Sequence, residues 1–165
     1  MFALASASLF AATPLLKLSR SVTVHASLQV AWARIGQFDG VAAWHPAVAR
    51  DELISGRNAT IGAERVLTLR DGGTLTEKLL AYDAKHHRYR YAIVSGSLPV
   101  SDYTATLGVK AAGRDRSRVT WSATFRRKDA AANPAPNAND AVATQAVAGF
   151  HQAGLTNLRK VLDLK

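Results

Sequence analysis

Polar and apolar residues alternate with a period of two over most of this chain, and short turn sequences separate the alternating stretches. Such alternation is typical of strands with one buried face. It predicts a first strand at Leu16–His25 and six more at Val48–Ser55, Glu64–Arg70, Thr74–Asp83, Arg88–Ser95, Tyr103–Ala111 and Arg118–Arg127. Because the later separators are short and rich in turn residues, these strands are expected to form hairpins and an antiparallel meander.

Apolar residues recur at three- and four-residue spacing in two regions, which predicts helices. Ser27 is the expected N-cap of a helix over Leu28–Phe38, and a second short helical piece contains Ala42-Ala43-Trp44. The last helix is expected over Ala141 to about Leu164, with Asp140 as its cap. Its apolar residues form one stripe: Ala143, Val147, Phe150, Gly154, Leu158 and Val161.

The elements predict an α+β architecture in which one long helix must cover a wide apolar sheet face. A helix about 10 Å across cannot fill a wide curved sheet, so volume is left between the two. We expect a seven-stranded curved antiparallel sheet wrapped around the long C-terminal helix, with two short helices after the first strand and an internal cavity. Sandwich-like closure of the sheet on itself is the alternative.

Two charged residues, Arg65 and Glu77, share the apolar faces of adjacent predicted strands joined by Asp71-Gly72-Gly73. Their inward neighbours by period are Ala63, Leu67 and Leu69 on one strand, and Leu75, Leu79 and Ala81 on the other. Charges on such faces are costly unless they pair or line a wet cavity. A guanidinium can anchor an oxyanion or carboxylate, and a carboxylate in an apolar cavity can shuttle a proton. A buried pair that only fixes strand register is the alternative.

Composition narrows the function classes. The chain has no cysteine, which excludes disulfides, thiolate metal sites and a cysteine nucleophile. It also lacks GxSxG, P-loop, dinucleotide-binding and zinc motifs, so we predict no metal and no cofactor.

The formal net charge is +9, which raises the question of an anionic partner. The basic residues are expected at turns or on the outward phase of strands: Arg57, Arg70, Lys85, Arg88, Arg90, Arg114, Arg116, Arg118, Arg126, Arg127 and Lys128. No RNA-binding aromatic motif or helix-turn-helix accompanies them. We therefore expect no specific nucleic-acid partner, but weak contact with an anionic membrane surface through charge alone.

Phe2–Ala12 is an apolar run that is too short to span a bilayer. It has the length of a signal-peptide core, but no Lys or Arg precedes it. We interpret residues 1–13 as an N-terminal tail and residues 14–165 as one domain in a cytoplasmic protein. Removal of the tail as an export signal, with a periplasmic location, is the alternative.

Short motifs follow one another along the chain in a characteristic order: Val24-His25-Ala26, Val30-Ala31-Trp32, Trp44-His45-Pro46, Gly62-x-x-Arg65-x-Leu67, Asp71-Gly72-Gly73-x-x-x-Glu77-x-Leu79, Tyr91-x-Ile93, Leu98-Pro99-Val100-x-x-Tyr103, Val119-x-Trp121 and Gly154-Leu155-x-x-Leu158. In their order and spacing the chain resembles the START / Bet v 1-like (SRPBCC) superfamily, in particular its polyketide cyclase/dehydrase and lipid-transport branch. The resemblance covers roughly Lys17 to Leu162. It implies the helix-grip fold, a bacterial-type protein, and a hydrophobic ligand-binding cavity lined by the sheet.

Among plant members, the chain is similar to the abscisic acid receptors and the onion lachrymatory factor synthase. In the synthase, an arginine and a glutamate on neighbouring strands act on a small sulfenic acid, and Arg65 and Glu77 resemble them. The receptors carry a Ser-Gly-Leu-Pro gate loop where this chain has only Asp71-Gly72-Gly73, so abscisic acid recognition is not expected. Ser95–Tyr103 is the candidate lid.

The predicted site joins the polar pair Arg65 and Glu77 to a wall from the strands, the first helices and the last helix. Its other members are Trp44, His45, Leu67, Leu79, Tyr91, Ile93, Leu98, Pro99, Tyr103, Trp121, Phe125 and Phe150. His45 is either a ligand or proton contact at the cavity mouth or, as we favour, a solvent-facing residue of a packing corner. Tyr91 and Tyr103 share the inward phase, as cavity wall or simply as core.

We therefore expect a binding or carrier protein for a small hydrophobic or amphipathic molecule. An enzyme of the cyclase, dehydrase or isomerase type is the alternative, with Glu77 as general acid/base and Arg65 as electrostatic stabiliser. A third hypothesis is a protein without a ligand whose basic face docks on an acidic partner or a membrane.

Overall fold

The computed structural model describes residues 13–164, and the predicted N-terminal tail up to residue 12 lies outside the described residues. The described chain contains seven strands, two α-helices and one 3-10 helix. In chain order these are β1 (Leu16–Val24), α1 (Leu28–Ile35), η1 (Val41–Ala43), β2 (Val48–Ser55), β3 (Glu64–Leu69), β4 (Thr74–Asp83), β5 (Arg88–Gly96), β6 (Val100–Ala111), β7 (Ser117–Arg127) and α2 (Asp140–Asp163). The predicted order of elements is confirmed.

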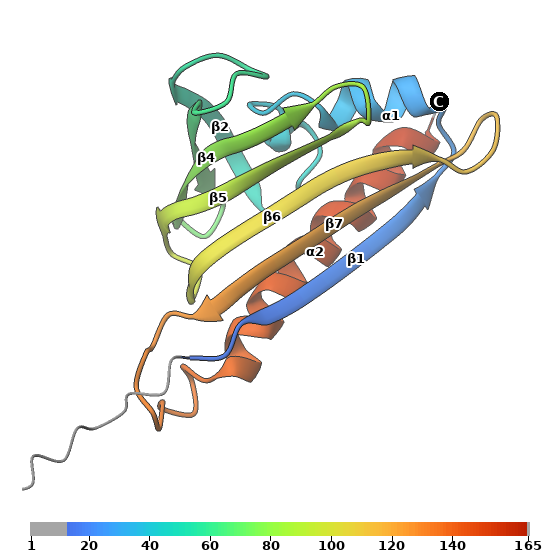
Figure 1. Cartoon of the computed structure of the whole chain (residues 1–165). Coiled ribbons are helices and arrows are strands. Elements are labelled where there is room, and N and C mark those ends of the chain that lie inside the picture. Colours follow the sequence, from blue (N-terminus) through green and yellow to red (C-terminus); the bar gives the residue numbers. More distant parts are fainter. Residues whose placement is uncertain (1–12, 165) are drawn as a thin grey trace, which may run out of the picture.

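The strands form one antiparallel sheet in the order β1-β7-β6-β5-β4-β3-β2. Strands β2 to β7 are a meander, and β1 pairs with β7, so α1 and η1 carry the chain from one edge of the sheet to the other. Figure 1 shows the sheet curving around α2, which runs along its concave side. Since β1 and β2 are the two edges of this sheet, it stays open, and the predicted helix-grip fold is confirmed in place of a closed sandwich.

Strand alternation puts the apolar side chains on the face that α2 covers, but a bulge in β4 changes the phase. The pairing of β4 with β5 shifts between Leu79 and Ala81. Ala81 is therefore exposed, and the prediction that it shares the inward phase of Glu77 is wrong. Beyond the bulge Tyr82 turns inward instead, and its hydroxyl donates to the Gly36 carbonyl at 3.0 Å.

Capping groups define both helices. Ser27 is the N-cap of α1, as predicted, and its hydroxyl accepts from the Val30 N–H at 3.4 Å. Helix α1 ends at Ile35, three residues before the predicted end. Asn139, and not Asp140, caps α2 through a bond from the Val142 N–H at 3.0 Å.

Asp140 instead pairs with Arg127, whose Nη1 lies 2.7 Å from its carboxylate. Arg127 is only 7 % exposed, so its predicted place in the outward basic set is wrong. The predicted stripe of α2 also shifts by one residue at two positions, because His151 and Leu162 are buried where Phe150 and Val161 were expected. The ion pair and the stripe together fix α2 against the end of β7.

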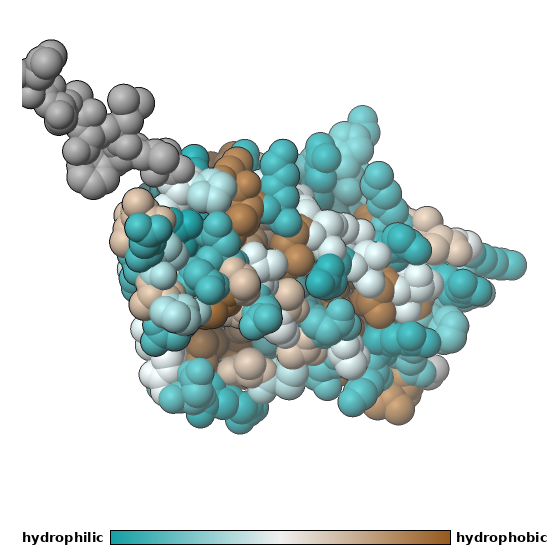
Figure 2. All heavy atoms as spheres, turned by 90° about the horizontal axis from the view of Figure 1, so that it is seen from below, coloured by the Kyte–Doolittle hydropathy of each residue, from teal (hydrophilic) through white to brown (hydrophobic). Residues whose placement is uncertain are grey.

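Figure 2 shows one face of the molecule, on which hydrophilic residues predominate and apolar residues lie in small groups between them. Within residues 13–164, no helix is both long and apolar enough to cross a membrane.

Candidate functional site

Arg65 and Glu77 lie opposite each other on the β3–β4 hairpin, because its register pairs these two positions directly. Arg65 Nε and Nη2 both donate to Glu77 Oε2, at 2.8 and 2.6 Å. Each residue is 1 % exposed. On the neighbouring strands, Leu53 of β2 pairs with Arg65, and Ile93 of β5 pairs with Glu77. Both are half-buried. The predicted ion pair on the inner face is therefore present, and it is sealed from solvent.

Asp51 is a third member of this cluster that the sequence analysis missed. Arg65 Nη1 lies 3.3 Å from Asp51 Oδ2, and the Asp51 side chain is fully buried. The same oxygen accepts from the Val41 N–H at 2.8 Å, at the start of η1. Arg65 Nη1 also donates to the Phe38 carbonyl. The N-terminal helical segment and three strands thus converge on one guanidinium.

A bulge explains why alternation did not reveal Asp51. The pairing of β2 with β3 shifts between Val48 and Arg50. A regular strand beginning with Val48 inward would place Arg50 and Glu52 inward too. The shift turns Asp51 inward instead, opposite Leu67. The only available signal was that Asp51 shares its phase with Leu53.

Burial dominates the electrostatics of this cluster. It raises the pKa of Asp51 to about 6, against the opposing attraction of Arg65. The pKa of Glu77 is also raised by burial, which outweighs its charge and hydrogen bonds with Arg65. Burial disfavours the charged form of Arg65, yet the surrounding negative groups, Glu77 first, keep its pKa above the ordinary value. Two carboxyls share one permanent cation, so the cluster takes up a proton in mildly acidic solution.

Aromatic side chains lie beside the cluster. The Arg65 guanidinium lies 4.2 Å from the centre of the Phe38 ring and 5.6 Å from that of Tyr91. The Tyr91 hydroxyl accepts from Trp121 Nε1 at 3.0 Å, and the ring centres of Tyr91 and Tyr103 are 6.2 Å apart. The expected inward phase of both tyrosines is confirmed, and burial raises the pKa of each.

His151 extends this aromatic set onto α2 and was also missed. Its Nε2 lies 2.8 Å from the Tyr103 hydroxyl, and its ring stacks on Trp121 with centres 4.2 Å apart. Burial lowers the pKa of His151 to about 3, so the ring is neutral at physiological pH. The residue belongs to the buried stripe of α2, one position from the predicted Phe150.

His45 is buried, at 1 % exposure, and the prediction that it faces solvent is wrong. Its Nδ1 accepts from the Ala47 N–H at 3.2 Å, so Nε2 carries the proton and donates to the Phe150 carbonyl at 2.9 Å. Burial lowers the pKa of His45 to about 4. Gly154 makes this contact with α2 feasible, because a Cβ there would lie 2.5 Å from His45 Cδ2.

The remaining predicted wall residues divide into a buried and a half-buried set. Buried among the apolar core are Trp44, Leu67, Leu79, Trp121 and Phe125. Half-buried are Ile93, Leu98, Pro99 and Phe150. The candidate lid is shorter than expected, since β5 ends at Gly96 and β6 begins at Val100, leaving only a three-residue turn.

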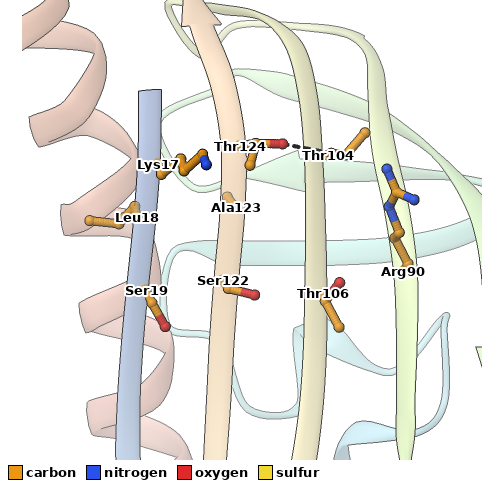
Figure 3. A pocket seen from close by; sticks show the side chains of 9 residues that line it. All are labelled: Lys17, Leu18, Ser19, Arg90, Thr104, Thr106, Ser122, Ala123 and Thr124. Carbon is orange, nitrogen blue, oxygen red and sulfur yellow. Dashed lines mark hydrogen bonds between the residues drawn. The ribbon is translucent and has the colours of Figure 1, made fainter. Parts of the chain in front are cut away.

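The outer face of the sheet has a different character (Figure 3). Strand register aligns Ser19, Ser122, Thr106 and Arg90 in one row across β1, β7, β6 and β5. The small hydroxyl side chains of the two serines and the threonine leave a hollow of about 560 Å³. Its lining contains Lys17 and Arg90 but no carboxylate. Arg65 and Glu77 are on the opposite, inner face of the sheet.

Among residues 13–164, no three His, Asp or Glu side chains come together as a potential metal site.

Comparison with known proteins identifies the family of this chain. A family model described as polyketide cyclase / dehydrase and lipid transport matches residues 16–163, nearly the whole chain. The chain belongs to this family. Its membership supports a ligand-binding or cyclase-type role. A search of curated proteins gave no match.

Several solved structures share the family's fold with this chain. Protein XoxI from Bacillus cereus is 26% identical with a TM-score of 0.78, over 88% of this chain and 94% of its own. The ZhuI aromatase/cyclase from Streptomyces sp. R1128 also has a TM-score of 0.78, at 14% identity, over 90% and 94% of the two chains. Norcoclaurine synthase from Thalictrum flavum, solved with a transition-state analogue, is 18% identical with a TM-score of 0.69, over 92% and 96%. The last two show the fold alone.

Proposed function

We propose that this family member binds a small hydrophobic or amphipathic molecule between the concave face of the sheet and α2. The ligand's polar end would lie at the cluster of Arg65, Glu77 and Asp51. Its apolar part would contact the aromatic side chains beside that cluster.

The observation that carries this proposal is a set of buried polar atoms without partners. Within the described residues, four such side-chain atoms have no hydrogen bond: Trp44 Nε1, Asp51 Oδ1, the Tyr89 hydroxyl and His151 Nδ1. An unsatisfied buried polar group costs about 1–3 kcal/mol. A core that served only stability would replace these groups with apolar ones, whereas a binding interior retains them for a ligand.

Native mass spectrometry of protein purified from its own host tests the proposal, followed by denaturing extraction of any adduct. We expect a reproducible apolar or amphipathic adduct that is reduced or lost in Arg65→Ala. Arg70→Ala is the matched control, because Arg70 is exposed just beyond β3 and its side chain donates to the Pro46 carbonyl, outside the cluster. An adduct that survives equally in both variants would remove Arg65 from the site.

The alternative to a ligand-binding role for Arg65 and Glu77 is a purely structural ion pair. In that case Arg65→Leu combined with Glu77→Leu would raise stability and leave the adduct unchanged, as replacement of buried ion pairs by apolar residues does elsewhere. We expect the double variant to lose the adduct.

A second candidate function is catalysis, which the raised pKa of Glu77 favours. A carboxyl whose pKa is raised by burial, beside a fixed cation, is suited to general acid/base chemistry. An enzyme predicts that Glu77→Gln retains ligand binding but abolishes turnover of an unsaturated or polyketide-like compound. A carrier predicts only a modest loss of affinity, with a greater loss in Arg65→Ala. Glu64→Gln, on the same hairpin and partly exposed, is the control.

A further inference from the structure

The positive charge of Arg65 already has more than one acidic partner in the cluster. Two of its nitrogens donate to Glu77, and the third lies 3.3 Å from Asp51 and donates to the Phe38 carbonyl. The ring of Phe38 lies over the guanidinium, with its centre 4.2 Å from Cζ. A ligand carboxylate would therefore add a third anion to one cation in a site without water access. Such an arrangement is strongly unfavourable at low dielectric constant.

Two neighbouring polar atoms in this region lack a hydrogen-bond partner. Asp51 Oδ1 is a buried acceptor without a donor, and the Tyr89 hydroxyl is buried without any partner. Tyr89 belongs to the same surroundings, since its ring centre is 6.0 Å from that of Phe38 and 6.0 Å from that of Tyr91. A hydroxyl group is the smallest neutral group that both donates and accepts. It satisfies a carboxylate oxygen and a phenol together, which an ionised carboxylate cannot do.

We propose that the polar cluster selects a ligand with an uncharged hydroxyl group, an alcohol or a phenol, and rejects the corresponding carboxylate. The ligand hydroxyl donates to Asp51 Oδ1 and pairs with the Tyr89 hydroxyl. Asp51 is thus a specificity-determining residue, and Arg65 holds the two carboxyls in place without binding an anion itself. This inference rests on the proposed ligand-binding function.

The test compares three probes with one chain length: 1-decanol, decanoate and methyl decanoate. Each competes with the neutral fluorescent dye N-phenyl-1-naphthylamine for the full-length protein at neutral pH. We expect 1-decanol to bind at least about tenfold more tightly than decanoate, because the carboxylate meets two buried carboxyls. Methyl decanoate, which accepts but cannot donate, should fall between them.

Two variants examine the two parts of the cluster separately. Asp51→Asn removes one negative charge and should reduce the preference for 1-decanol over decanoate to less than about threefold, chiefly by improving decanoate binding. Tyr89→Phe removes only a hydroxyl and should weaken 1-decanol by about three- to tenfold, the value of one neutral hydrogen bond, while methyl decanoate changes less. It keeps the ring packing, so it reports on the cluster even if Asp51→Asn fails to fold.

The outcomes separate this inference from the proposed function. Equal or tighter binding of decanoate by the wild-type protein overturns the hydroxyl preference while leaving ligand binding intact. An unchanged preference in Asp51→Asn and unchanged 1-decanol affinity in Tyr89→Phe also overturn it. If neither the dye nor any probe binds and no adduct is found, the proposed function fails, and this inference fails with it.

Discussion

At the scale of single residues, Asp51 makes the stability of the fold depend on pH, and a single substitution can measure this contribution. Its folded pKa of about 6 lies above the ordinary value of 3.8. Between these values the folded protein holds a proton that the unfolded chain has lost, so Asp51 stabilises the fold at the acidic end. This contribution is lost as the pH rises through about 6. Asp51→Asn cannot ionise, and its stability relative to wild type should rise by about 2–3 kcal/mol between pH 4 and pH 7.

Urea unfolding of both proteins across this range measures the difference. The two buried histidines act with the opposite sign: their folded pKa values are about 4 and 3, so falling pH protonates the unfolded chain first and destabilises the fold. His45 and His151 are present in both proteins, and their effect cancels in the comparison. Glu52→Gln, at an exposed carboxyl on the same strand, is the control for a carboxyl-to-amide change outside the buried cluster. A stability difference between Asp51→Asn and wild type that does not vary with pH would contradict the prediction.

At the scale of elements, the fit of α2 against the sheet depends on Gly154. A Cβ at this position would lie 2.5 Å from His45 Cδ2 and 3.0 Å from Trp121 Cζ3, so the buried rings must move. Gly154→Ala gains up to about 1 kcal/mol of helix propensity, but overpacking of a filled core costs about 1–3 kcal/mol. We expect a net loss of stability and a lower melting temperature, together with a change in the fluorescence of the buried tryptophans.

Gly149 provides the matched control on the same helix. It is exposed, and an added Cβ there meets nothing within 4 Å. Gly149→Ala should therefore stabilise the protein by about 0.5–1 kcal/mol. If both alanine variants were stabilised alike, the close approach of α2 to His45 would not constrain the fold.

The strands show which structural features could be predicted from the sequence and which could not. Alternation and turn residues predicted every strand, and the register of the β3–β4 hairpin brought Arg65 and Glu77 together as expected. The errors arise where one extra residue enters a strand, because a single bulge reverses the inward phase of all that follows. The bulge in β2 concealed Asp51, and the bulge in β4 exposed Ala81. Apart from the shared phase of Asp51 and Leu53, no local sequence signal marks either bulge, since both depend on pairing with the neighbouring strand.

Side-chain contacts between elements that are far apart in the chain could not be predicted from the sequence either. His45 was predicted to face solvent because it lies in a Trp-His-Pro packing corner, but Gly154, more than a hundred residues away in the sequence, lets α2 cover it. His151 has no partner at a recognisable spacing in the sequence, because its partner, Tyr103, comes from β6. The apolar pattern thus predicted the sheet and the helix, whereas the polar contacts between them required the packed structure.

At the scale of the whole molecule, the sheet separates two kinds of chemistry. Its inner face holds the aromatic side chains and the buried carboxyls, and its outer face holds hydroxyls and cations (Figure 3). Four cations on the outer face have no ion-pair partner among the described residues: Lys17, Arg90, Lys110 and Arg118. No aromatic side chain lines the hollow beside Lys17 and Arg90 or the one beside Lys110 and Arg118, so base stacking of the kind used for single-stranded nucleic acid has no platform in either.

Because the chain has a formal net charge of +9 and these four cations lie on the outer face, this face is suited to weak, salt-sensitive contact with an anionic membrane surface, which we propose as its partner. Vesicles of phosphatidylcholine with about 30% phosphatidylserine should co-sediment the protein at low salt, and raising the salt to about 0.3 M should release it. Vesicles of phosphatidylcholine alone should not bind. Because each surface cation contributes about 1 kcal/mol, replacing these four residues by Gln should reduce binding by at least about tenfold.

A charge-matched variant decides whether the face or only the total charge is responsible. Replacing Arg57, Arg114, Arg116 and Lys160 by Gln removes the same charge from exposed positions away from the centre of the outer face. If the outer face is the contact, this variant should bind the anionic vesicles several-fold more tightly than the first. Equal losses in the two variants would mean that net charge alone drives the attraction, and binding that persists at high salt would contradict an electrostatic contact altogether.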